Sequence, residues 1–303
     1  MRIAIALLSL CSCVFAGPPM GLPVIPPSAN LQAAIDTGAP LVFVPKGNYE
    51  LDAPLRLRSN LTLVFEPGTT IINAVGKFQG RDDSLVVLEG VQNVTINADG
   101  AILKMTKADF RDPIKYPIQS EWRHVLDVRG SKNVTINGGT YSDSGGDGLY
   151  LGPWVQTTTR TPNSNITVRR AIFDNNFRQG VSVLSCIGCV LEDSVLSRTN
   201  GTSPQSGIDF EPELGDSFDM IVRRCRSEGN RGPAYMVSLQ KTTTALLPAP
   251  RVAFESCTYS GVPADQPTMR LVGIFNAAAP TGYLMPNLPA ATTIRWDSLE
   301  WKK

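Results

Sequence analysis

The sequence predicts an all-β protein folded as a single-stranded, right-handed parallel β-helix, a solenoid of stacked coils, with a short N-terminal capping helix. A phrase recurs along the chain: residues 93–96 and 133–136 both spell Asn-Val-Thr-Ile, and residues 165–168 spell Asn-Ile-Thr-Val. The copies lie tens of residues apart, a spacing typical of units that bury their apolar face by stacking on neighbours. Runs rich in Val, Ile and Thr end at Gly, Asn, Ser or Asp, as strands do at turns. A β-sandwich also has many short strands, but the matching phrases favour the solenoid.

Composition limits the classes of function. The chain has 303 residues, of which 42% are hydrophobic and 18% charged, so it can bury a large core. Its net charge of +1 argues against nucleic-acid binding, which usually needs a basic stripe. No apolar run beyond the N-terminus approaches the roughly 20 residues of a membrane helix, so we expect no membrane span.

The first 16 residues resemble a signal peptide. Arg2 supplies the positive start, residues 3–10 are apolar, and Val14-Phe15-Ala16 resembles a cleavage site before Gly17. A short buried strand or a lipoprotein signal around Cys11 are the alternatives. We therefore expect a secreted or periplasmic protein whose residues 17–303 form one β-helix domain.

The remaining elements follow in chain order. Leu31, Ala34 and Ile35 recur at helical spacing after Asn30, which can cap a helix, so a short helix should close the N-terminal end. Strands are expected within residues 40–51 and 60–72, and coils from residue 84 to Gly261. Beyond Gly261 the repeat is lost, and we expect this segment to run along the outside and end in a strand at residues 292–301.

Four cysteines remain after the leader, and an even number in an exported protein allows disulfides. Cys186 and Cys189 form a Cys-x-x-Cys pair, whereas Cys225 and Cys257 should stack inside the coil, as a disulfide or as two inert thiols. No second such pair and no histidine cluster completes a zinc site, since His124 is the only histidine. A lone histidine is more often structural than catalytic.

Period-two alternation identifies the side chains that leave the core. Stacking the strands places four of them in one outward row, within reach of one sugar ring because coils rise by about 4.8 Å. This row contains Asp127, Tyr150, Ser182 and Asp209.

Asp209 and Glu211 are the leading catalytic candidates. They lie two residues apart on one strand, roughly 6.6 Å at the backbone, and should project outward together. Carboxyls about 6.5–9.5 Å apart suit an inverting glycosidase, in which one protonates the leaving oxygen and the other activates water. A separation nearer to about 5 Å would predict retention. A calcium site or a solvated turn are the alternatives, so we expect no cofactor apart from a possible calcium ion.

Neighbouring coils supply further candidates. Asp147, among three glycines, opens a strand two coils earlier than Asp209. We expect it to be catalytic, and a capping aspartate in a glycine turn is the alternative. Arg178 could neutralise a sugar carboxylate, as a further catalytic residue, unless it only forms a salt bridge with Asp147 or Asp209. Gln179, Tyr150, Asp127 and Trp122 are expected to bind substrate. Residues 104–122 and 153–163 interrupt the repeat, and such long insertions would wall a groove over the outward row.

These features together resemble the pectate-lyase-like β-helix superfamily. A helix, a Val-Phe-Val-Pro-x-Gly-x-Tyr strand pair and Asn-Val-Thr-Ile coils follow one another over residues 28–260. The resemblance implies the fold but leaves the reaction open, because the superfamily includes polysaccharide lyases, polygalacturonase-like hydrolases, mannuronan epimerases and phage tailspikes. Gln179 stands where the epimerases place histidine, and the Gly-His-Gly and Arg-x-Lys motifs of the polygalacturonase-like hydrolases are absent from the sequence.

Three functions remain. We expect a carbohydrate-active enzyme that acts on a polysaccharide, as a glycoside hydrolase with paired carboxylates on the outward face. A lyase or epimerase acting on a uronic-acid polymer is the alternative, and it would need a base such as Arg178 or Tyr150. A non-catalytic carbohydrate-binding surface protein ranks third, because acids rather than aromatic residues line the outward face. We expect a monomer.

Overall fold

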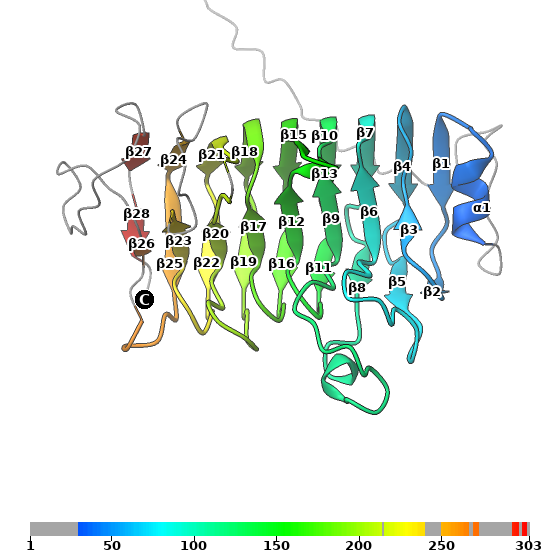
Figure 1. Cartoon of the computed structure of the whole chain (residues 1–303), viewed down its shortest axis with the longest axis horizontal. Coiled ribbons are helices and arrows are strands. Elements are labelled where there is room, and N and C mark those ends of the chain that lie inside the picture. Colours follow the sequence, from blue (N-terminus) through cyan, green and yellow to red (C-terminus); the bar gives the residue numbers. More distant parts are fainter. Residues whose placement is uncertain are drawn as a thin grey trace, which may run out of the picture.

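The computed structural model describes residues 30–213, 215–239 and 250–266, and the backbone of three further strands at 269–272, 293–296 and 299–301. These residues form an elongated parallel β-helix, with α1 (Leu31–Asp36) at one end and the C-terminal strands at the other (Figure 1). The expected signal peptide lies outside the described residues. No helix in the described part of the chain is long and apolar enough to cross a membrane.

Three parallel sheets run the length of the solenoid, and successive coils add one strand to each. The first sheet contains β1 (Leu41–Val44), β4 (Leu61–Phe65), β7 (Gln92–Asn97), β10 (Lys132–Asn137), β15 (Asn163–Arg169), β18 (Cys186–Glu192), β21 (Phe218–Arg223), β24 (Arg251–Glu255) and β27 (Thr293–Trp296). The second contains β2 (Asn48–Leu51), β5 (Thr70–Asn73), β8 (Ile102–Lys104), β11 (Thr140–Ser142), β16 (Ile172–Asp174), β19 (Val195–Ser197), β22 (Arg226–Glu228), β25 (Cys257–Ser260) and β28 (Leu299–Trp301).

The third sheet carries the candidate site. Its strands are β3 (Leu55–Arg56), β6 (Val86–Glu89), β9 (Leu126–Arg129), β12 (Leu149–Gly152), β17 (Val181–Val183), β20 (Ile208–Phe210), β23 (Tyr235–Ser238) and β26 (Met269–Val272). Two insertions leave the coils. One forms an antiparallel hairpin of β13 (Trp154–Gln156) and β14 (Thr159–Thr161), and the other, residues 105–122, holds the 3-10 helix η1 (Asp109–Arg111).

The repeated phrase explains the register, and it confirms the predicted fold. Val134 pairs with Val94 on one side and with Ile166 on the other, so equivalent residues of the three copies lie in line. The predicted capping helix is also present: the Asn30 side chain accepts hydrogen bonds from the backbone N–H groups of Gln32 and Ala33, which an N-cap residue satisfies.

An asparagine ladder runs along the corner of the coils at the first sheet. Asn60, Asn93, Asn133 and Asn165 all adopt left-handed backbone angles, with φ between 55° and 58°, which asparagine tolerates better than most residues. Each side-chain amide donates to the oxygen of the preceding one, at 2.9 Å, 3.0 Å and 3.2 Å. The ladder therefore satisfies the corner side chains from coil to coil.

The segment after Gly261 corrects one prediction. It was expected to leave the coils, but β26, β27 and β28 extend the three sheets by pairing with β23, β24 and β25. The strand expected at residues 292–301 is present as β27 and β28, but its expected path outside the coils was wrong because that prediction followed the repeated phrase. Parallel pairing requires only a short extended segment in register, and the final strands supply this without that phrase.

The cysteines adopt two different states. Cys186 and Cys189 form a disulfide across an irregularity in the register of β18, where Ile187 and Cys189 face consecutive residues of β21. Cys225 and Cys257 are buried free thiols on neighbouring coils, which decides between the two states that the sequence allowed.

Strand β16 offers a matched test of core packing. Phe173 is fully buried and stacks on Tyr141 of the preceding coil, with ring centroids 5.4 Å apart, whereas its neighbour Ile172 is 40% exposed. We expect Phe173→Ala to lower the free energy of unfolding by about 3–5 kcal/mol, because the cavity cannot close in a stacked core. Ile172→Ala should cost about 1 kcal/mol or less. Urea denaturation of both variants checks this, and equal losses would contradict the assigned alternation.

Candidate active site

The predicted row of polar residues exists on the third sheet. Tyr150 pairs with Asp127 in β9 and with Ser182 in β17, and Ser182 pairs with Asp209 in β20. The row is not open to solvent, however, since Asp127, Ser182 and Asp209 are all buried. Alternation identified the side chains that leave the core, but not the groups that cover them. The expectation of an exposed carboxylate row is therefore corrected.

Glycines allow the coils of this sheet to approach closely just before the row. A Cβ on Gly148 would lie 2.6 Å from the Gly180 carbonyl oxygen, and one on Gly180 would lie 2.4 Å from that of Gly207. These glycines directly follow Asp147, Gln179 and Ser206, whose backbones continue the pairing: Gly148 N–H donates to Gln179 O, and Gly180 N–H donates to Ser206 O. A second row of polar side chains thus lies beside the first.

Gln179 fixes Asp209. Its Nε2 donates to Asp209 Oδ2 at 2.9 Å, and its Oε1 accepts a hydrogen bond from the Ser206 hydroxyl. All three residues are buried. The other oxygen of Asp209, Oδ1, is buried and has no hydrogen-bond partner in the structure. Both ends of the Gln179 amide therefore bind protein groups, and the substrate contact expected of Gln179 stays a prediction.

Arg178 lies at the centre of a carboxylate cluster. Its Nη2 is 2.9 Å from Glu211 Oε2, and its Nε is 3.5 Å from Glu121 Oε1. The side chains of Arg178 and Glu211 are 13% and 15% exposed, whereas that of Asp147 is 1% exposed. The cluster thus has an inner layer, Asp147 and Asp209, and an outer layer, Arg178, Glu211 and Glu121.

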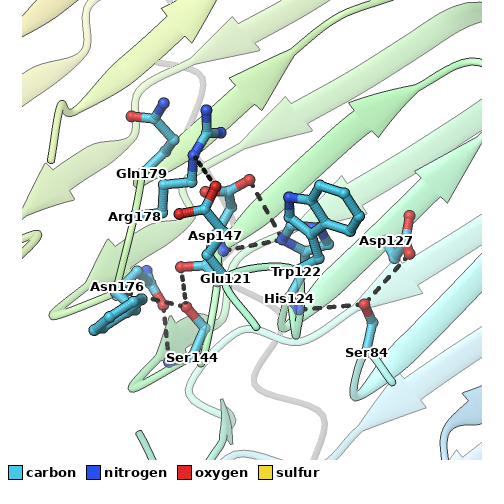
Figure 2. A network of polar contacts seen from close by, with 12 residues as sticks. Ser84, Glu121, Trp122, His124, Asp127, Ser144, Asp147, Asn176, Arg178 and Gln179 are labelled. Atoms are coloured by element: carbon cyan, nitrogen blue, oxygen red, sulfur yellow. Dashed lines mark hydrogen bonds and ion pairs between the residues drawn. The ribbon is translucent and has the colours of Figure 1, made fainter. Parts of the chain in front are cut away.

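Asp147 contacts the chain's single histidine. The Asp147 backbone N–H donates to His124 Nδ1 at 2.9 Å, and Asp147 Oδ2 lies 3.3 Å from the same nitrogen. An Nδ1 that accepts a hydrogen bond leaves the proton of a neutral imidazole on Nε2. Figure 2 shows the His124 ring turned toward Asp147, with Arg178 and Glu121 beside that carboxylate. Neither carboxylate oxygen of Asp147 has a hydrogen-bond partner in the structure.

Tyr150 is held between a ring and a cation. It stacks on His124 with ring centroids 4.7 Å apart and an interplanar angle of 11°, and the Arg129 guanidinium lies 4.8 Å from the Tyr150 ring centroid. Arg129 in turn donates to both oxygens of Asp127, at 2.8 Å and 3.0 Å, and the Ser84 hydroxyl also donates to Asp127. Asp127 therefore anchors the stack, at the opposite side of His124 from the carboxylate cluster (Figure 2).

Burial dominates the electrostatics of the inner layer. It raises the pKa of Asp147 to about 7, although the Arg178 guanidinium acts in the opposite direction. Burial, together with the negative charge of Glu211, also raises the pKa of Asp209 to about 7, against the effects of Arg178 and Gln179. Burial holds the pKa of His124 well below its usual value, and Arg129 and Arg178 add to this shift. His124 is therefore neutral near pH 7, while each of the two aspartates is partly protonated there.

Two other groups keep their protons. Burial alone would lower the pKa of Arg178, but the carboxylates of Asp147, Glu211 and Asp209 raise it overall. Burial raises the pKa of Tyr150, and the Asp127 carboxylate adds to the shift while Arg129 opposes it. Neither side chain can therefore serve as a base near neutral pH.

A surface groove of about 370 Å³ borders the cluster. Glu121 belongs to both the groove and the cluster, because it lines the groove and its Oε1 lies 3.5 Å from Arg178 Nε. Trp122 also lines the groove and is 37% exposed, but the Arg81 guanidinium stacks 3.6 Å from the centre of its ring. One of the two predicted insertions thus contributes to a wall beside the row.

The structure brings together most of the predicted site residues. Asp147, Arg178, Gln179, Asp209 and Glu211 form one cluster, and Tyr150 joins it through His124. Asp127 and Trp122 lie at its edges. Glu121 was missed because it belongs to an insertion without repeat, and His124 was assigned a structural position. A lone histidine three residues before the outward Asp127 was the available signal.

The expectation of no cofactor apart from a possible calcium ion stays a prediction. In the described residues, no group of three or more His, Cys, Asp or Glu side chains is arranged to hold a metal ion. The oxygens nearest to such a group are those of the carboxylate cluster, and Arg178 already supplies a positive charge among them.

The raised pKa values predict how stability depends on pH. Since free aspartate has a pKa of about 3.9, the folded state binds more protons than the unfolded state between about pH 4 and pH 7. The free energy of unfolding therefore falls as pH rises through this window. We expect wild type to lose about 2 kcal/mol more between pH 5 and pH 8 than Asp209→Asn or Asp147→Asn.

Thermal and urea denaturation at both pH values measure this difference. Asp219→Asn is the control, because Asp219 pairs with Arg251 on the surface, away from the cluster. Parallel pH profiles for wild type and both site variants would contradict the raised pKa values.

The chain is similar to known proteins in sequence over part of its length and in fold. No known family model matches the chain. The SPbeta prophage-derived uncharacterized protein YorA of Bacillus subtilis (strain 168) is 26% identical over 222 residues, which are 65% of this chain and 38% of YorA. The chain therefore spans little more than a third of the length of this relative.

Solved structures share the architecture. The iota-carrageenase of family GH82 from A. fortis superposes with a TM-score of 0.56 at 12% identity, over 76% of this chain and 53% of the enzyme. A Family 28 exopolygalacturonase of Yersinia enterocolitica gives a TM-score of 0.55 at 14% identity, over 89% of this chain and 61% of that enzyme. At such low identity the likeness concerns the fold alone. The chain is a right-handed parallel β-helix of the kind found in these proteins.

Proposed function

We propose that the protein is a glycoside hydrolase that cleaves a polysaccharide outside the cell. The observation that carries this proposal is the pair of buried aspartates with pKa values of about 7, which share Arg178 at the border of a groove. Hydrolysis of a glycosidic bond needs one carboxylic acid and one carboxylate. A carboxyl group with a pKa near the working pH is suited to donate a proton to the leaving oxygen.

Asp209 is the proposed proton donor. Gln179 fixes its Oδ2, whereas its Oδ1 has no hydrogen-bond partner in the structure and could reach a leaving oxygen. Glu211, two residues further along the chain, is the proposed base that activates water. Asp147 and Arg178 set the charge around this pair. Because Asp209 is fully buried, substrate must displace the outer ion pair between Arg178 and Glu211 before proton transfer.

A lyase or epimerase is less well supported. Either reaction would need a base that removes a proton next to the sugar carboxylate, and Arg178 and Tyr150 were the residues considered for it. The raised pKa values of both side chains keep them protonated. A binding protein would present a row of aromatic rings, but Tyr150 is covered by His124 and Arg129.

The similar structures support the substrate class. By their names, an iota-carrageenase and an exopolygalacturonase act on polysaccharides, and both superpose on this fold. Fold alone does not choose the reaction, so the chemistry rests on the carboxylate cluster. Export of the chain belongs to the same proposal and rests on the signal-like residues 1–16. The monomeric state stays a prediction.

A polysaccharide screen tests the function. Purified protein should release reducing ends from at least one neutral or acidic polysaccharide, without the ultraviolet absorbance of an unsaturated product. Asp209→Asn should lower this rate about 100-fold or more, since it removes the proton donor. Asp219→Asn, on the first sheet, should keep the full rate. An unsaturated product would establish a lyase, and silence on every substrate would reject both hydrolase and lyase in favour of an epimerase or a binding protein.

A further inference from the structure

Two of the arginines that line the groove beside the cluster stack on aromatic rings. Arg81 stacks on Trp122 with its Cζ 3.6 Å from the ring centroid, and Arg111 stacks on Phe177 at 4.0 Å. All four side chains line the groove, together with Gln119, Ser120, Glu121 and Thr202. The insertion, the segment before β6 and the turns before β17 and β20 thus meet at one place.

Neither guanidinium forms a salt bridge within the described residues. Most other described arginines do pair with carboxylates, and the cluster's own Arg178 pairs with two. Arg111 donates from Nη2 to the Ser120 carbonyl at 2.7 Å, but its buried Nε has no hydrogen-bond partner in the structure. Two positive charges therefore line the groove, and Glu121, which also lines it and raises the pKa of Arg111 against the effect of burial, is paired with Arg178.

Stacking on a ring orients the guanidinium groups of Arg81 and Arg111 for contact with an anion. A guanidinium that lies flat on an aromatic ring is fixed in orientation and keeps the N–H donors at its edge available. Such an edge matches the two oxygens of a carboxylate, or of a sulfate or phosphate group, and the resulting hydrogen bonds are charge-assisted. An uncharged sugar would make no charge-assisted hydrogen bonds with these two guanidinium groups.

We propose that this groove is a subsite for a negatively charged sugar unit of the substrate, which Arg81 and Arg111 recognise. The subsite adjoins the reacting groups, because Glu121 lines the groove and lies 3.5 Å from Arg178. The proposal rests on the proposed hydrolase function for the identity of the substrate as a polysaccharide. It adds that this polysaccharide is anionic, with carboxylate or sulfate groups on its units.

Calorimetric titration of the Asp209→Asn protein, which should not consume its ligand, tests the subsite. The probes are a uronic-acid oligosaccharide, a sulfated galactan oligosaccharide and a neutral cello-oligosaccharide. We expect at least one anionic probe to bind about tenfold more tightly than the neutral one, and to weaken as salt screens the charges. Comparison of the two anionic probes identifies the source of the charge.

Arginine variants in the same background locate the binding. Arg81→Gln and Arg111→Gln should each weaken the anionic probe about tenfold, the scale of one charge-assisted hydrogen bond. Arg111→Lys keeps the charge but loses the flat fork, so it should rescue only part of the binding. Arg226→Gln is the control, because Arg226 is an exposed arginine on β22, paired with Glu228. Arg81 is exposed, so its variant should keep the wild-type melting temperature.

The outcomes separate the two proposals. Arginine-dependent binding of an anionic probe, with no hydrolysis by wild type, would support the subsite and reject the hydrolase. Hydrolysis that Arg81→Gln and Arg111→Gln leave unchanged when each is placed in the otherwise wild-type chain, or equal binding of neutral and anionic probes, would overturn the subsite and keep the hydrolase. Failure of every probe to bind would also overturn it.

Discussion

In-register pairing between successive coils is the constraint on which the rest of the molecule depends. A single coil has too few inward side chains to form a core of its own, so each must lie on the next. Leu149, Val181 and Ile208 align for this reason, and all three are buried. The same register then fixes the position of the residue beside each of them. The positions of the candidate site residues therefore follow from core packing.

At the site, the close approach of the backbones restricts the positions of the polar side chains further. Gly148 and Gly180 leave no room for a side chain between coils, so the polar residues before them are held in line. Polar groups in such a tight space must find partners or shift their protonation. Gln179 and Ser206 satisfy one oxygen of Asp209, and the carboxyl responds to the remaining burial by a raised pKa. Packing and acid–base chemistry thus have a common origin.

The sequence predicted the fold well, and the site in part. The Asn-Val-Thr-Ile phrase revealed the register, and alternation placed Tyr150 and Asp209 in one row. The burial of that row could not be predicted, because groups that contact it, such as His124 against Tyr150 and Gln179 against Asp209, come from segments before the strands whose paths the repeat does not determine. A strand was predicted at residues 292–301, but the pairing of the last strands with the three sheets was missed for a related reason. Pairing depends on backbone shape, which sequences without the phrase can also adopt.

The asparagine ladder has a consequence for producing this protein in eukaryotic cells. Its four residues each begin an Asn-x-Thr sequence, the acceptor for N-linked glycans, which attach to the side-chain nitrogen. In Asn93, Asn133 and Asn165 that nitrogen donates to the preceding coil, whereas Asn60 in the ladder only accepts. A glycan on Asn60 would leave the ladder intact, but one on any of the other three would occupy a nitrogen that joins two coils. The choice of expression host therefore bears directly on how the coils are joined.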